Sequence, residues 1–136
     1  MKTILHISKY YSPFIGGIET VAKQLVSGLD CYHNIVICFS NDKQTHYDTI
    51  DGVQIIRVGV SVSISSQDIA PSYYTHLRRI IKSTQPDLVH IHCPNPYIYP
   101  LLLWLLPKHT KLVVHWHSDI LGKGILYHLI APFERQ

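Results

Sequence analysis

Apolar runs that alternate with amphipathic segments constrain the fold of this 136-residue chain more than any other feature. Five short runs rich in Val and Ile have the length of buried strands, at residues 3–8, 34–39, 53–58, 87–92 and 111–117. Apolar residues that recur with a period near 3.6 predict helices over residues 17–29, 70–84, 97–106 and 123–131. Strands without polar alternation, separated by helices, indicate a doubly wound, mostly parallel α/β sheet with helices on both faces.

Two stretches do not follow this rhythm. Residues 40–52 are polar and end in Asp51-Gly52, which is a turn signal. Residues 58–64 keep an apolar period of two, which fits either an extended strand or a loop at the edge of the sheet. The sequence leaves these two alternatives open.

Composition excludes several classes of protein. The chain is 46% apolar and 15% charged, which is typical of a globular protein and not of a disordered one. A net charge of +3 is too small to argue for nucleic acid as a partner. Three cysteines without metal-like spacing favour a reducing compartment. With no signal peptide and no apolar run of about 20 residues, we expect a cytoplasmic protein.

A glycine pair, Gly16-Gly17, lies between the first strand and the first helix. Glycine permits positive φ and a close approach of ligand to backbone. A helix that begins there directs free N–H groups and a positive dipole end at an anion, above all a phosphate. The pair fits neither G-x-G-x-x-G nor a P-loop, so a dinucleotide site is poorly supported. A plain tight turn remains the alternative, with Glu19 as a helix-end charge.

Histidines mark the ends of the fourth and fifth strands. His90 and His115 are expected to lie deeper and to pack in the core, whereas His92 and His117 are expected at the rim, where a ligand can meet them. Imidazole suits zinc. However, the deep and rim pairs are separated along the strands by ~6–7 Å, so we expect no metal site. Aromatic residues near the same rim suit sugar rings as well as packing.

These motifs together resemble a known family. The chain is similar to the N-terminal domain of the retaining glycosyltransferases of family four, which have the GT-B fold of two Rossmann-like domains. The resemblance covers the whole chain and rests on five motifs in order: Tyr11-x-Pro13, Gly16-Gly17-Ile18-Glu19, Ile50-Asp51-Gly52-Val53 with Arg57-Val58, Pro86-Asp87-Leu88-Val89-His90-x-His92, and Val113-Val114-x-x-His117-Ser118-Asp119-Ile120. At position 115 this chain has histidine where the family more usually has a small or hydroxylated residue.

The resemblance implies a function and a set of site residues. Residues 1–136 would form the N-terminal, acceptor-binding domain of an enzyme that transfers a sugar from a nucleotide-sugar donor to a glycan or lipid-linked acceptor, with retention of configuration. Neither a metal nor another cofactor is implied. We expect the C-terminal domain with most of the donor site to be absent from these 136 residues, and the chain alone to be inactive. The implied roles are catalysis for His117, donor-phosphate binding for Gly16 and Gly17, and acceptor binding for Tyr11, His92, Asn95 and Asp119.

Three alternatives stay open. The chain could be a non-catalytic module that binds a phosphorylated ligand, or a metal-dependent hydrolase that uses the four histidines of the fourth and fifth strands. The apolar segments at residues 97–106 and 125–133 could bring the protein into peripheral contact with the inner face of the membrane. Burial of these segments against the sheet, or against the C-terminal domain of such enzymes, competes with this interpretation.

Overall fold

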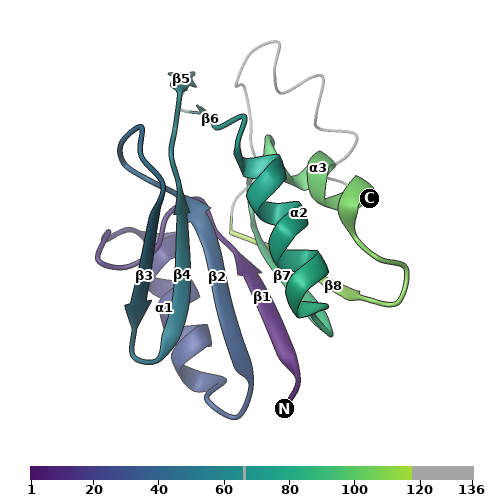
Figure 1. Cartoon of the computed structure of the whole chain (residues 1–136). Coiled ribbons are helices and arrows are strands. Elements are labelled where there is room, and N and C mark those ends of the chain that lie inside the picture. Colours follow the sequence, from purple (N-terminus) through teal and green to yellow (C-terminus); the bar gives the residue numbers. More distant parts are fainter. Residues whose placement is uncertain (66, 118–136) are drawn as a thin grey trace.

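A six-stranded sheet forms the centre of the molecule (Figure 1). The computed structural model describes residues 1–65 and 67–117. Within them the elements follow in this order: β1 (Thr3–Ile7), α1 (Gly17–Gly28), β2 (His33–Phe39), β3 (His46–Ile50), β4 (Val53–Val58), β5 (Val62–Ile64), β6 (Gln67–Ile69), α2 (Tyr73–Thr84), β7 (Leu88–Cys93), α3 (Ile98–Leu105) and β8 (Lys111–Trp116).

The order of the strands places a switch point at β1. The sheet reads β3-β4-β2-β1-β7-β8, and all neighbours are parallel except β3, which runs antiparallel to β4. The chain therefore builds outward from β1 on one side through β2 and β4, and on the other side through β7 and β8. In sheets of this kind, ligands bind beyond the carboxyl ends of the strands where the order reverses.

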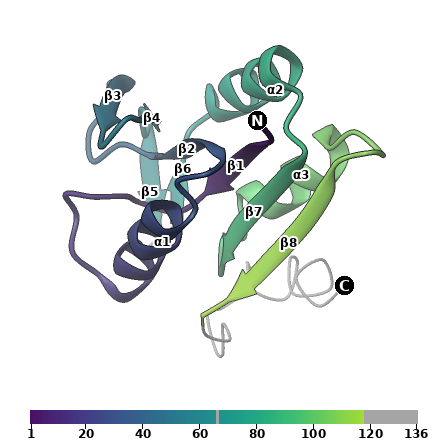
Figure 2. The same cartoon turned by 90° about the horizontal axis from the view of Figure 1, so that it is seen from below.

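Helices cover both faces of the sheet, as the sequence predicts. Figures 1 and 2 show α1 on one face and α2 on the other. On the α2 face, Leu77 of α2 and Leu102 of α3 join Leu5, Ile37 and Ile91 of the strands in the larger hydrophobic cluster. On the α1 face, a smaller cluster contains Tyr11, Ala22, Val26, Val36, Cys38 and Ile55. The doubly wound α/β architecture is confirmed.

Two hairpins depart from the expected order of elements. The polar stretch before Asp51-Gly52 contains β3, whose side chains alternate between half-buried and exposed. Asp51 (φ 51°) and Gly52 (φ 79°) are both left-handed, as a two-residue hairpin turn requires. The undecided stretch contains β5, which pairs with β6 in a separate two-stranded sheet. The helix expected over residues 123–131 lies outside the described residues.

The described helices are short. The longest of them have 12 residues. None of the helices within residues 1–65 and 67–117 combines the length and the hydropathy that crossing a membrane requires.

Candidate active site

Histidines from three neighbouring strands lie on one face of the sheet, at the carboxyl side of the switch point. In the register of β1, β7 and β8, His6 lies opposite His90, and His92 lies opposite His115. Residues two apart on a strand share a face. The backbone N–H of His117 donates to the carbonyl of Cys93 at 3.0 Å, which extends the β7–β8 pairing by one residue. One face thus carries five imidazoles, from His6, His90, His92, His115 and His117.

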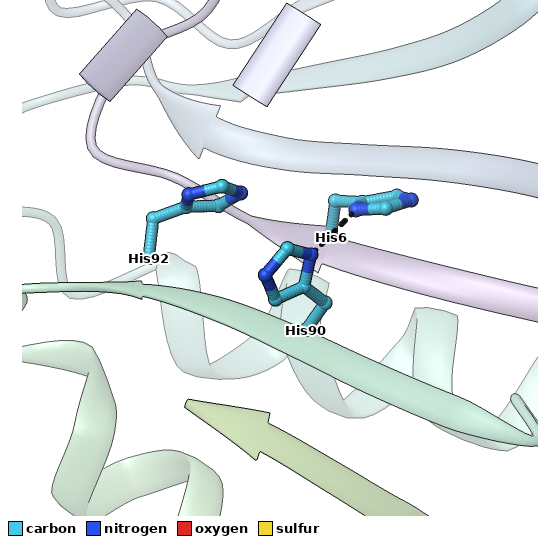
Figure 3. Close-up of side chains that lie close together, drawn as sticks. All are labelled: His6, His90 and His92. Carbon is cyan, nitrogen blue, oxygen red and sulfur yellow. Dashed lines mark hydrogen bonds between the residues drawn. The ribbon is translucent and has the colours of Figure 1, made fainter. Parts of the chain in front are cut away.

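The five rings form a continuous cluster. Neighbouring ring centroids are 4.3 Å apart for His115 and His117, 4.4 Å for His90 and His92, and 5.4 Å for His6 and His90. Figure 3 shows the inner three side chains, with His6 from β1 beside His90 and His92 from β7. His6, His90 and His92 are buried, whereas His115 and His117 are half-buried. The cluster therefore runs from the interior of the sheet to its accessible rim.

This geometry corrects one expectation about depth. The sequence predicts that His115 pairs in depth with His90 and packs in the core, but the register places His115 opposite His92 and Val113 opposite His90. His115 is half-buried and not part of the core. The error arises because the offset between two parallel strands depends on the loops and helix between them, which the strand sequences do not encode.

Hydrogen bonds assign protons at the inner end of the cluster. The Asn34 amide nitrogen donates to the carbonyls of Leu29 (2.7 Å) and Tyr32 (3.2 Å), so its oxygen is the atom 2.9 Å from His6 Nε2. An amide oxygen only accepts, so His6 Nε2 carries the proton. In a neutral His6, Nδ1 is then a bare acceptor for the Nδ1–H of His90 at 3.3 Å. Asn34 thereby sets the tautomers of two buried histidines.

The rim histidines form a second pair. His92 Nδ1 and His117 Nε2 are 2.9 Å apart, and one of these two nitrogens donates to the other. This hydrogen bond joins β7 to the last described residue after β8. It couples a fully buried imidazole to one that a ligand can reach.

Burial keeps most of this cluster neutral. Burial and the neighbouring imidazoles lower the pKa of His92 to about 3 and that of His90 to about 4. Burial also lowers the pKa of His6, against the opposing effect of the Asn34 hydrogen bond. For His117, burial and His115 lower the pKa, whereas the Glu19 carboxylate raises it. At neutral pH these four side chains act as hydrogen-bond donors and acceptors rather than as cations.

Three buried polar atoms at this edge have no hydrogen-bond partner within the described residues. They are Ser8 Oγ after β1, His92 Nε2 in β7 and Asn95 Nδ2 after β7. Buried polar atoms are nearly always hydrogen-bonded, and an exception requires an explanation. Three exceptions at the carboxyl ends of two adjacent strands indicate a place that a polar ligand completes. Sequence reasoning missed Ser8, whose signal was a lone hydroxyl at the end of an apolar strand.

The glycine turn lies at the N-terminus of α1, as expected, but neither glycine uses a positive φ. Gly16 is extended (φ −167°) and caps the helix, and its carbonyl accepts from the N–H of Thr20. A Cβ at Gly16 would lie 2.1 Å from the Glu19 carboxylate, which folds back over the turn. A Cβ at Gly17 would meet nothing within 4 Å. Gly16 therefore serves close approach of a side chain, and Gly17 borders open space.

A buried arginine holds the loop before α1. Arg57 of β4 donates to the carbonyls of Tyr11 and Ser12, and its Nε lies 2.6 Å from the Asp48 carboxylate. Its guanidinium is buried on the α1 face of the sheet. Sequence reasoning used Arg57 only as part of a motif. A charge within an apolar strand was the signal that it anchors this loop.

The predicted acceptor residues do not all come together. His92 and Asn95 lie at the same edge, and both carry an unpartnered atom. Tyr11 is only 3% exposed and packs with α1, β2 and β4 in the smaller cluster. The structure thus shows a packing role for Tyr11, and its binding role stays a prediction. Asp119 lies outside the described residues.

Two groups of histidines have the spacing of metal ligands. His6, His90 and His92 form one, and His92, His115 and His117 form the other, each with one ring nitrogen per residue within 4.8 Å. The sequence argument against a metal relied on the distance between a deep and a rim pair. The second group avoids that objection because His115 lies level with His92.

Known proteins resemble this chain over most of its length. The GDP-mannose:cellobiosyl-diphosphopolyprenol alpha-mannosyltransferase of Komagataeibacter xylinus is 26% identical over 132 residues. That match covers 90% of this chain and 32% of the relative, so the chain spans about a third of the curated protein it matches. A family model described as Glycosyltransferase Family 4 matches residues 15–136. This Rossmann-like chain therefore belongs to glycosyltransferase family 4 and corresponds to the N-terminal domain of such enzymes.

Proposed function

We propose that residues 1–136 form the acceptor-binding domain of an enzyme that transfers a sugar, with retention, from a nucleotide-diphosphate sugar to a glycan or lipid-linked acceptor. The observation that carries this proposal is the group of buried, unpartnered polar atoms of Ser8, His92 and Asn95. They lie at the switch point of the sheet, where such folds bind ligands. Membership of family 4 supports the reaction class.

Neutral imidazoles suit the handling of a sugar. A sugar hydroxyl both donates and accepts, and a neutral histidine offers one donor and one acceptor. His117 is half-buried, hydrogen-bonded to His92 and kept neutral by burial. We assign to it the contact with the transferring sugar or the acceptor hydroxyl. His92 and Asn95 hold the acceptor from the buried side.

The N-terminus of α1 suits the leaving diphosphate. Its free N–H groups and dipole attract negative charge, and Gly17 leaves the approach open. Charge that develops on the diphosphate in the transition state is stabilised by donors already in place. Because the rest of the donor site belongs to the C-terminal domain of such enzymes, we expect this chain alone to bind a nucleotide sugar weakly or undetectably.

The reaction of the K. xylinus relative is the first to test. Its name specifies GDP-mannose as donor and a cellobiosyl-diphosphopolyprenol as acceptor. A chimera would carry this chain in place of the matching N-terminal region of that enzyme. We expect mannose transfer from GDP-mannose, or from another nucleotide sugar in a donor screen. A folded chimera without any sugar transfer, beside an active parent enzyme, would contradict the proposal.

Two pairs of variants test the assigned roles in the active chimera. We expect His117→Ala to lower kcat by about 10²-fold or more, the scale reported for loss of one transition-state hydrogen bond, while the exposed His109→Ala retains activity. Gly17→Leu should obstruct the diphosphate, whereas Gly28→Leu, at the other end of α1 and equally free of neighbours, should not. If His117→Ala and Gly17→Leu leave rate and affinity intact, these assignments are wrong.

We also propose peripheral membrane contact through α3. Ile98, Tyr99 and Leu102 of this helix are buried, whereas Leu103 and Trp104 are 40% and 76% exposed. We expect the chain to float with liposomes in a density gradient and Trp104→Ser to abolish this, with Trp116→Ser on β8 as the matched control. Absence of flotation would indicate that this apolar surface packs against protein instead.

A further inference from the structure

Positive charge is unevenly distributed along the chain. Residues 69–117 contain five Lys and Arg residues and one acid, Asp87, whereas residues 1–68 contain five Lys and Arg residues and six acids. Asp87 is already engaged, because its carboxylate accepts from the backbone N–H of Thr3 at 2.8 Å. The net positive charge of the chain therefore comes from the segment that forms α2, β7, α3 and β8.

The helix α2 presents three of these cations to solvent. Arg78, Arg79 and Lys82 are exposed, and the helix contains no acidic residue. None of the three belongs to an ion pair with any residue that the structure describes. Like charges three and four residues apart on a helix repel each other. An anionic partner would relieve this repulsion.

An exposed aromatic side chain of α3 lies at one end of these cations. Tyr74, Arg78 and Lys82 follow each other at steps of four residues, so they share one side of α2. The ring of Tyr74 contacts that of Trp104 in α3, with centroids 5.9 Å apart, and Trp104 is 76% exposed. Figure 1 shows α3 next to α2 on the same side of the sheet. The indole and the cations thus belong to one continuous surface.

This combination of side chains fits a lipid surface that carries negative charge. Indole rings favour the interface between membrane and water, and anionic lipids attract Lys and Arg. The exposed apolar area of α3 is small, since it comes mainly from Leu103 and Trp104. Attachment to a membrane depends on buried apolar area together with electrostatic attraction, and stable anchoring takes more than one signal. The cations of α2 supply the second signal.

We propose that α2 and α3 form a docking surface for membranes that contain anionic phospholipid. Arg78, Arg79 and Lys82 contact the charged headgroups, and Trp104 enters the interface beside them. The inference rests on the membrane contact proposed above for α3 and specifies the lipid. The histidine cluster lies on the α1 face, opposite α2, so docking leaves the candidate site uncovered.

The first test varies the lipid and leaves the chain unchanged. Flotation compares vesicles of phosphatidylcholine alone with vesicles that also contain phosphatidylglycerol. We expect binding to the anionic vesicles to be about tenfold tighter or more, on the scale of about fivefold for each cation near an anionic surface. Added salt should weaken this binding, because salt screens exposed charges. Equal binding to both kinds of vesicle would overturn the inference and leave the contact through Trp104 standing.

The second test removes the charges of the docking surface. A triple variant with Arg78→Gln, Arg79→Gln and Lys82→Gln should bind anionic vesicles about 100-fold more weakly, as three such losses predict. Circular dichroism checks that the variant folds, which we expect because all three side chains are exposed.

A matched control removes the same net charge elsewhere. Lys2, Lys23 and Lys43 are also exposed but lie outside α2 and α3, and their triple replacement by Gln should bind as the unchanged chain does. If the two triple variants bind alike, net charge and not this surface is responsible, and the inference is wrong. Absence of flotation with either lipid would remove the inference together with the membrane contact. Selective flotation beside a folded chimera without sugar transfer would remove the proposed reaction alone.

Discussion

The two faces of the same sheet differ in what they contribute. On β7, Val89, Ile91 and Cys93 are fully buried in the larger cluster, against α2 and α3. Between them on the same strand, His90 and His92 point to the α1 side and join the histidine cluster. Strand alternation thus gives one strand two tasks, apolar packing on one face and imidazole chemistry on the other.

The difference continues across the sheet. The smaller cluster under α1 draws its strand residues from β2 and β4, namely Val36, Cys38 and Ile55, and within the described chain it includes none from β7 or β8. The part of the α1 face that carries the histidines has Val113 43% exposed. We infer that the α2 face supplies most of the stability, while the histidine-bearing part of the α1 face is kept open for ligands.

The largest effect should come from the apolar face. Ile91→Ala removes a fully buried side chain, and we expect a loss of about 3 kcal/mol in the free energy of unfolding. Val113→Ala, on the histidine face of the neighbouring strand, should cost less than about 1 kcal/mol. Urea denaturation of both variants measures the contrast. Equal losses in the free energy of unfolding would show that the α2 face does not supply most of the stability.

The next effect concerns the polar anchor on the α1 face. Arg57→Met keeps the bulk of the side chain but leaves the carbonyls of Tyr11 and Ser12 without donors, so we expect a loss of about 2–3 kcal/mol. Amide exchange in residues 11–16 should also accelerate. Asp48→Asn should cost less than about 1 kcal/mol, because Asp48 is 44% exposed. Unchanged exchange in Arg57→Met would refute the anchoring role.

The same division explains which parts of the fold were predictable from sequence. Unbroken apolar runs predict the buried strands, and a period of 3.6 predicts the helices, as with Ala22 and Val26 of α1. The edge strand β3 is not predicted from the sequence. Only one of its faces is covered, so its polar residues resemble those of a loop. β3 forms because it pairs with β4 across the turn at Asp51 and Gly52. The sequence predicts the turn, but the pairing of the two strands is a tertiary interaction.

The candidate site was predictable in its location more than in its details. Parallel strands bring their carboxyl ends to one edge, so His92, Asn95 and His117 could be placed there in advance. The position of His115 opposite His92 could not be predicted, because it depends on the register between β7 and β8. For Ser8 the sequence offers only a weak signal, a lone hydroxyl at the end of an apolar strand, and its lack of a hydrogen-bond partner is visible only in the structure.

Acid should weaken the protein through the histidine face. Below pH 6.5, histidines of the unfolded chain take up protons while His90 and His92, with pKa values of about 4 and about 3, stay neutral in the folded chain. The contribution of these two histidines to the free energy of unfolding is therefore complete above pH 6.5. It is lost progressively as the pH falls toward 4 and then 3. His90→Gln should reduce this slope by up to about 1.4 kcal/mol per pH unit. Urea denaturation across pH 4–7 compares the unchanged protein with His90→Gln. Identical dependence of the free energy of unfolding on pH would contradict the lowered pKa of His90.

The smallest effect is the position of one proton. Because the Asn34 oxygen accepts from His6 Nε2–H, and His6 Nδ1 in turn accepts from His90, we expect His90 to be protonated at Nδ1. Neutral histidine in water favours the proton on Nε2, so this tautomer requires the protein. Ring ¹⁵N shifts at pH 7 distinguish the two forms, with the exposed His109 as the internal reference. A proton found on Nε2 of His90 would mean that the order imposed by Asn34 ends at His6, and that the inner histidines are packed without being oriented toward the rim.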